Sequence, residues 1–129
     1  MAKYFQSSYG PMASFKPPPQ QSASLVQRLC ELFSLFHTCF KVFPKSDRFL
    51  GQKVETVILE ILELLLSASY SDRQTKHILL KKASEKVDLL KYLIRIAFEI
   101  KALNLKMYIN LEENILIIGK MLGGWIRSN

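Results

Sequence analysis

The amino-acid sequence predicts an all-α protein, an antiparallel up-down-up-down bundle of four helices. Apolar residues recur at three- and four-residue steps from Leu25 almost to the end of the chain, which is the period of an amphipathic helix. No segment shows the alternation of a strand, and short connections between helices favour antiparallel neighbours. A length of 129 residues suits one domain, and there is no fixed repeat of the kind that builds solenoids.

The chain divides into a tail and a bundle. Residues 1–24 are rich in Pro, Ser and Gln and carry two lysines but no acid, so we expect a disordered basic tail there. Residues 25–129 are predicted to form the bundle. Its first helix spans 25–43 and ends before Pro44, which has no amide hydrogen to continue the ladder.

Polar residues predict the limits of the other helices, which we expect at 47–70, 72–103 and 106–126. Ser46 or Asp47 can cap the second helix. Ser71 and Gln74 have the spacing of a capping box at the start of the third helix. Asn104 is a candidate for the left-handed residue that ends it.

The second and third helices have more apolar residues than one core-facing stripe needs. The surplus forms an additional strip on each helix: Leu59, Leu62 and Leu66, and Leu89, Leu93, Ile96 and Ile100. These strips either widen the contact between the two helices or bind another subunit. Large apolar patches are uncommon on monomers, so the sequence favours subunit association.

The last helix contains Gly119 and Gly123, each of which costs about 1 kcal/mol relative to alanine in a helix interior. Close backbone approach would compensate for this cost, whereas fraying of the helix end is the simpler explanation for Gly124. Trp125 shares the core-facing stripe and is predicted to anchor the packing.

The charge balance favours an anionic partner. Eighteen Lys and Arg residues against eleven Asp and Glu give a net charge of +7. Residues 74–103 carry seven of the cations and three acids, and these cations are our candidate binding residues: Lys76, Lys81, Lys82, Lys86, Lys91, Arg95 and Lys101.

Helical spacing predicts three ion pairs among them, Lys81–Glu85, Asp88–Lys91 and Arg95–Glu99. Lys82 and Lys86 have no obvious acid on their own side of the helix. They are candidates for a multivalent binding surface in an oligomer, although an ordinary solvated face accounts for them equally well.

No catalytic, metal or cofactor site is predicted. The two histidines lie outside any metal-binding motif, and we expect His37 to be half-buried and structural. Arg73 and His77 are separated by three residues, which is too few for the Arg-x₄₋₆-His motif of HEPN ribonucleases. A binding role is therefore favoured over catalysis.

The cysteines and the chain start suggest the cellular compartment. Cys30 and Cys39 lie on opposite sides of one predicted helix, so they cannot form a disulfide within it, and free thiols suit a reducing compartment. No signal peptide or membrane span is evident, which predicts a cytoplasmic protein without a membrane partner.

Three motifs resemble those of a known family: Phe43-Pro44-Lys45-Ser46-Asp47-Arg48-Phe49 followed by Gly51-Gln52-Lys53, the run from Leu59 to Leu65, and the ending Gly119-Lys120-Met121-Leu122-Gly123-Gly124-Trp125-Ile126. Together, over residues 25–129, they are similar to the accessory variability determinant (Avd) proteins of diversity-generating retroelements. Their wider relatives are four-helix proteins encoded in intervening sequences of bacterial 23S ribosomal RNA.

The resemblance implies a basic homopentameric barrel of four-helix protomers without catalytic activity. Such a protein binds the element's reverse transcriptase and template RNA, or DNA, and supports mutagenic cDNA synthesis. On this basis Pro44, Arg48 and Phe49 fix the turn between the first two helices. The alternative is an oligomeric structural or protein-interaction module without a nucleic-acid role.

Overall fold

The computed structural model describes residues 20–129, and helices are the only regular secondary structure in this part of the chain. The helices are α2 (Gln20–Phe40), α3 (Arg48–Ser69), α4 (Arg73–Glu99) and α5 (Leu105–Ser128), with a short 3₁₀ turn, η2, at Lys45–Asp47. The all-α prediction is confirmed for these residues. The predicted tail lies outside them up to residue 19, but α2 begins five residues earlier than expected, and Ser22 is already buried.

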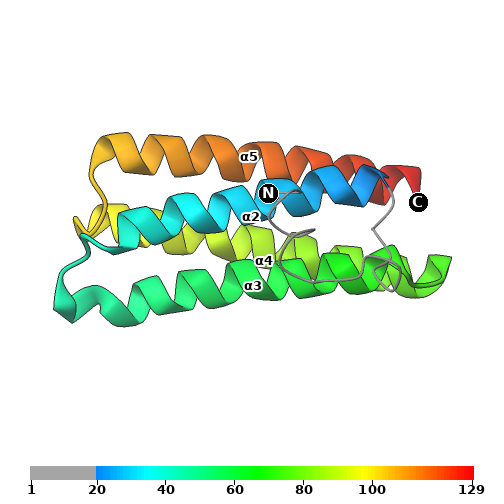
Figure 1. Cartoon of the computed structure of the whole chain (residues 1–129), viewed down its shortest axis with the longest axis horizontal. Helices are drawn as coiled ribbons and strands as arrows, with labels where there is room; N and C mark the ends of the chain where they lie inside the picture. The colour runs from blue at the N-terminus through cyan, green and yellow to red at the C-terminus, as the bar shows by residue number, and fades with distance from the viewer. Residues whose placement is uncertain (1–19) are drawn as a thin grey trace, which may run out of the picture.

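Each long helix packs against two others. α2 contacts α3 and α5, and α4 contacts the same two helices, so the four surround one core. The α2–α3 and α4–α5 connections lie at one end of the bundle, and the α3–α4 connection and the C-terminus lie at the other (Figure 1).

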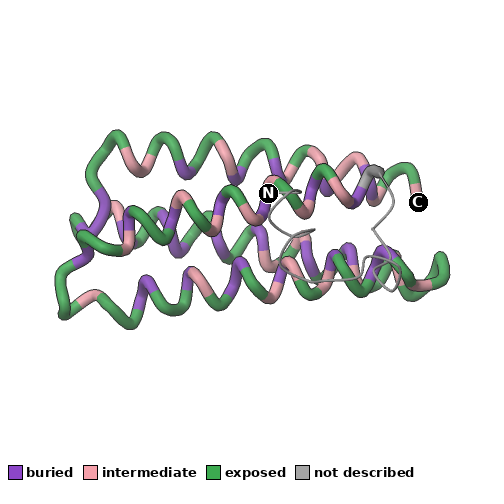
Figure 2. Tube along the Cα trace, in the orientation of Figure 1, coloured by how far each residue is buried: buried purple, intermediate pink, exposed green. Residues whose placement is uncertain are grey.

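The core is built from one apolar stripe on each helix (Figure 2). Its largest fully buried side chains include Phe36 of α2, Ile61 of α3, Leu80 of α4 and Leu111 of α5. Trp125 is also buried at the end of α5, which confirms it as a packing anchor.

α2 is shorter at its end than predicted, because the helix stops at Phe40 and not at Phe43. The amides of Val42 and Phe43 bond to the carbonyls of Cys39 and Phe40, three residues back, in a tight turn. Phe43 nevertheless remains buried, so its apolar character reflects core packing outside the helix.

The expected capping box at Ser71 is wrong. Asp72 is the N-cap of α4, and its carboxylate accepts a 2.9 Å hydrogen bond from the amide of Thr75. The Ser71 hydroxyl instead donates to the carbonyl of Ser67 in the preceding helix. A carboxylate at the cap also benefits from the positive end of the helix dipole.

The predicted role of Asn104 is also wrong. α4 ends at Glu99, and the left-handed residue in the connection is Lys101, with φ of 67°. Asn104 starts α5, because its side-chain oxygen accepts a 2.8 Å hydrogen bond from the amide of Met107. Asn serves both at helix starts and as a left-handed stop, so its type alone does not separate the two roles.

Gly51 is the glycine on which the packing depends. It is buried in α3, and a Cβ atom there would lie 2.6 Å from Cζ of Phe40 and closer to two other ring atoms. At Gly119 the nearest atom to an added Cβ is 4.0 Å away, and at Gly123 it is an Arg127 nitrogen of the same helix. The expected close approach at those two glycines is therefore not made within the chain.

Candidate nucleic-acid and partner surfaces

Residues 20–129 do not bring three or more His, Cys, Asp or Glu side chains together as a metal site would require. Cys30 and Cys39 are both free thiols, and burial is the main cause that raises the pKa of each. Arg73 and His77 are exposed in the first turns of α4.

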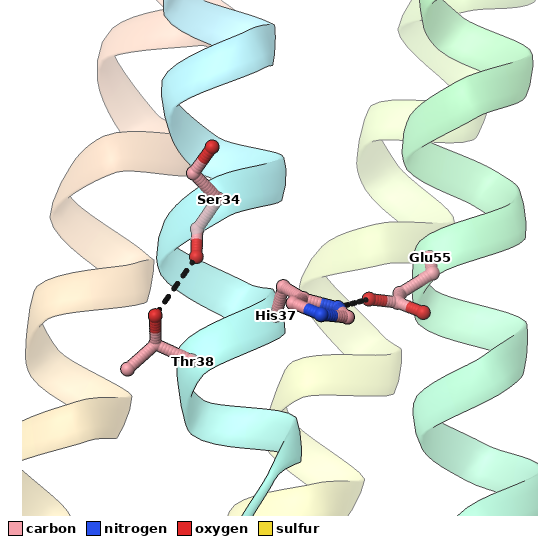
Figure 3. A network of polar contacts seen from close by, with 4 residues as sticks. All are labelled: Ser34, His37, Thr38 and Glu55. Carbon is pink, nitrogen blue, oxygen red and sulfur yellow. Dashed lines mark hydrogen bonds and ion pairs between the residues drawn. The ribbon is translucent and has the colours of Figure 1, made fainter.

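His37 does not have the half-buried position expected of it. Its side chain is 56% exposed, and its Nδ1 atom lies 2.8 Å from Oε2 of Glu55 in α3 (Figure 3). Phe33, one turn earlier in α2, stacks on the imidazole ring. His37 thus bridges α2 and α3 at the surface, because an edge position lets its ring reach across to a neighbouring helix.

The cations of α4 do not form a single patch. Lys86 reaches Glu60 of α3 with an Nζ–Oε1 distance of 3.3 Å, an interhelical acid that the sequence alone did not reveal. Lys91 lies on the opposite flank, beside α5, where it lines a shallow pocket with Ile109 and Leu116.

Two of the three predicted ion pairs are confirmed. Lys91 lies 3.8 Å from Asp88, and Nε of Arg95 lies 3.0 Å from Glu99, whose carboxylate raises the pKa of Arg95. The third pair, between Lys81 and Glu85, is not made. Exposed pairs at this spacing contribute only a few tenths of a kcal/mol, so solvation of the lysine competes easily.

The remaining candidates differ in exposure. Lys81 and Lys82 are exposed and have no ion pair within residues 20–129, whereas Lys76 is half-buried. Lys101 follows α4 and lies in the connection to α5. Lys81 and Lys82 are therefore the α4 cations most open to an anionic partner.

The α4–α5 flank contains one further polar network, which the sequence did not suggest. The Tyr108 hydroxyl donates a 2.8 Å hydrogen bond to Glu112, which raises the pKa of Tyr108. The Tyr108 ring stacks on Phe98 of α4 with the centroids 4.4 Å apart. This network joins α4 to α5 beside Arg95.

Most of the additional apolar strip residues are uncovered within the chain. Leu59, Ile96 and Ile100 are each 45% exposed, and Leu66 and Leu89 are exposed as well. Leu62 is half-buried against the core. Leu93 is a core residue, so the assignment of Leu93 to an interface strip is wrong. The contact between α3 and α4 does not absorb these strips.

The two strips face different sides of the bundle. Glu60 marks the α4 side of α3, and Leu59 and Leu66 lie about 100–120° around the helix from it. Leu59 lines a groove with Leu29 and Phe33 of α2. On α4, by contrast, Leu89 and Ile100 lie within about 60° of Lys86, the residue that reaches α3.

The three residues assigned to the α2–α3 turn have unequal roles. Pro44 caps η2 with φ of −58°, and Arg48 begins α3. Phe49 is 69% exposed, so it contributes little to packing at the turn. Gly51, two residues further on, is the position that lets the first two helices approach.

The excess positive charge of the described residues lies at the ends of the bundle. The segments 41–48 and 100–106, which we call the basic end, form the end where α2 meets α3 and α4 meets α5 (Figure 1). This end carries five cations against one acid: Lys41, Lys45, Arg48, Lys101 and Lys106, with Asp47. The helices between the two ends carry eight cations and nine acids, counted over residues 20–40, 49–69, 77–99 and 107–126.

Comparison with known proteins decides the family. The sequence profile of the bAvd-like family matches residues 24–129, which is the described bundle almost in full. The chain belongs to the bAvd-like family. No curated protein matches the chain significantly.

Membership of the bAvd-like family is consistent with the resemblance to accessory variability determinant proteins, and it indicates an accessory role in diversity-generating retroelements. Avd-like proteins form a non-catalytic accessory family. Within residues 20–129, no helix has the length and apolarity needed to cross a membrane.

Proposed function

We propose that this chain is a non-catalytic, cytoplasmic subunit of a diversity-generating retroelement that binds the element's reverse transcriptase and template RNA. In this role it supports mutagenic cDNA synthesis. The observation that carries the proposal is the match of residues 24–129 to the bAvd-like family.

The working unit in this proposal is a homopentamer of up-down-up-down protomers. A ring needs two different surfaces on each subunit that fit each other, because a rotational contact is heterologous. The apolar strips on α3 and α4 support such an arrangement, since both are exposed and they face different sides.

Lys81 and Lys82 support RNA or reverse-transcriptase binding along α4. They are exposed, they form no ion pair in the described bundle, and a ring repeats them around its axis. Repetition increases apparent affinity for a long polyanion, and each phosphate contact releases counterions.

A matched pair of charge reversals tests this surface. Lys81→Glu with Lys82→Glu changes the charge of α4, whereas Lys53→Glu with Lys120→Glu makes the same change on exposed lysines elsewhere. Template RNA binding is measured against salt concentration, together with capture of the reverse transcriptase. We expect the α4 variant to lose much more affinity and to lower the salt slope by about two relative to the control.

Three outcomes would contradict parts of the proposal. Equal losses in both variants would remove α4 from the binding surface. Assembly without RNA affinity at physiological salt, and without reverse-transcriptase binding, would favour a structural module. Light scattering tests the ring separately, because a particle of one 14.9 kDa chain at micromolar concentration would refute the pentamer.

A further inference from the structure

A surface pocket opens at the basic end, where α2 turns into α3. It has a volume of about 300 Å³. Its lining residues are His37, Phe40, Lys41, Phe43 and Arg48. The pocket therefore places aromatic side chains beside cations. Neither core packing nor the solvation of a surface turn accounts for this combination.

The aromatic side of the pocket, formed by Phe40 and Phe43, is fixed by packing within the bundle. The ring of Phe40 packs edge-on against Phe43, with centroids 5.2 Å apart, and stacks on fully buried Phe36 at 5.9 Å. Gly51 of α3 passes beneath the Phe40 ring, where any larger residue would displace it. The half-buried face of Phe40 is therefore preorganised before a ligand arrives.

The polar residues of the pocket differ in whether they already have a partner. His37 is paired with Glu55, which keeps its ring against the α2–α3 edge (Figure 3). Lys41 and Arg48 are exposed and form no ion pair within residues 20–129. Asp47 is the one acid of this end, against five cations.

We propose that this pocket binds one nucleotide of a single-stranded nucleic acid, with the base against Phe40 and the adjoining phosphates on Lys41 and Arg48. Proteins that hold single strands combine aromatic platforms for bases with cations that follow the backbone. The other cations of the basic end, Lys45, Lys101 and Lys106, lie in or beside the connections at that end, where they can meet neighbouring phosphates.

A single strand fits these observations better than a duplex or an acidic protein. A base inside a duplex is stacked and cannot enter a pocket, and a purely acidic peptide segment offers carboxylates for the cations but no planar group to lie against Phe40. The site deepens the proposed nucleic-acid role but lies apart from α4, so each can fail without the other.

The test uses the full-length chain and labelled twelve-nucleotide RNA and DNA single strands, with a duplex of the same sequence. Fluorescence anisotropy gives affinity across a range of salt concentrations. Lys41→Ala with Arg48→Ala removes two pocket cations, and Lys53→Ala with Lys120→Ala is the control of equal charge. We expect the pocket variant to bind single strands roughly ten-fold more weakly, with a salt slope smaller by about 1.4.

A second variant tests the base contact. Phe40→Leu removes the aromatic ring while keeping an apolar side chain, and Phe98→Leu makes the same change at a half-buried aromatic outside the pocket. Losing one base stack should weaken single-strand binding roughly five-fold or more and leave duplex binding unchanged. Thermal unfolding of both variants checks that the bundle remains folded.

Equal affinity of the two double-alanine variants would overturn the site, as would a Phe40→Leu variant that binds single strands like Phe98→Leu. A weak pocket variant beside an unaffected Lys81→Glu, Lys82→Glu variant would support the pocket and refute the α4 surface. The reverse pattern would leave the proposed function intact and overturn this inference. Matching losses for RNA and DNA would identify stacking and phosphate contacts, and not the 2′-hydroxyl, as the basis of recognition.

Discussion

Replacing Gly51 with alanine should destabilise the bundle, although the same change usually stabilises a helix. An alanine in a helix interior is favoured over glycine by about 1 kcal/mol. At this position, however, the new methyl group overlaps the ring of Phe40, which is itself confined by Phe36 and Phe43. The ring must move, and the helices cannot separate without opening the core.

The magnitude follows from what the ring loses. Each aromatic pair contributes about 0.5–1.5 kcal/mol beyond its buried area, and overpacking costs about 1–3 kcal/mol. Displacing the ring from both pairs and overpacking the contact, less the helix gain of about 1 kcal/mol, leaves a net destabilisation of about 1–5 kcal/mol. For a bundle of this size the melting temperature should fall by at least about 4 °C.

Gly119→Ala is the matched control, because an added Cβ there meets only Val87, at 4.0 Å. It should stabilise the protein by up to about 1 kcal/mol. Urea and thermal unfolding at one fixed protein concentration measure both variants, since association would make the transition depend on concentration. A Gly51→Ala protein as stable as Gly119→Ala would refute the steric argument.

Three further substitutions test the caps and the core. Asn104→Ala should cost about 1 kcal/mol in urea unfolding, because the amide of Met107 loses its acceptor, and an unchanged midpoint would contradict this role. The backbone amide and the hydroxyl of Thr75 hold the pKa of Asp72 below its ordinary value near 3.8. The charged Asp72 side chain therefore stabilises the folded protein at pH values above 3.8, and this stabilisation is lost as the pH falls through the lowered pKa. The stability difference between wild type and Asp72→Asn should therefore narrow in acid, whereas a constant difference would show that the charge is not responsible. Trp125→Ala should cost about 3–5 kcal/mol in thermal unfolding, and a loss below 1 kcal/mol would mean that the site collapses around the gap.

Hydrophobic periodicity was sufficient to predict the helices, because each contributes one stripe to a single core. It was less informative at their ends, where the decisive quantity is which side chain reaches a free amide. Asp72 and Ser71 are adjacent, and both are good caps, so only the backbone geometry selects Asp72. Asn104 shows the same ambiguity between ending one helix and starting the next.

The sequence was weakest where residues from different helices meet. Lys86 has no acid on its own side of α4, and its partner, Glu60, is 26 positions away in the sequence. The pocket likewise depends on the orientation of Phe40, which is set by Gly51 from the next helix. A glycine a few residues after an aromatic-rich helix end was visible in the sequence, but its contact with one particular ring was not.

The separation of charge along the bundle has a practical consequence. In the proposed ring, copies would meet side by side along helices whose charges between the connections are nearly balanced, so added salt has little repulsion to screen and slightly strengthens apolar contacts. The same salt would displace a polyanion held at the basic end, because counterion release is the source of such affinity. Concentrated salt should therefore strip bound nucleic acid during purification and leave the proposed ring intact.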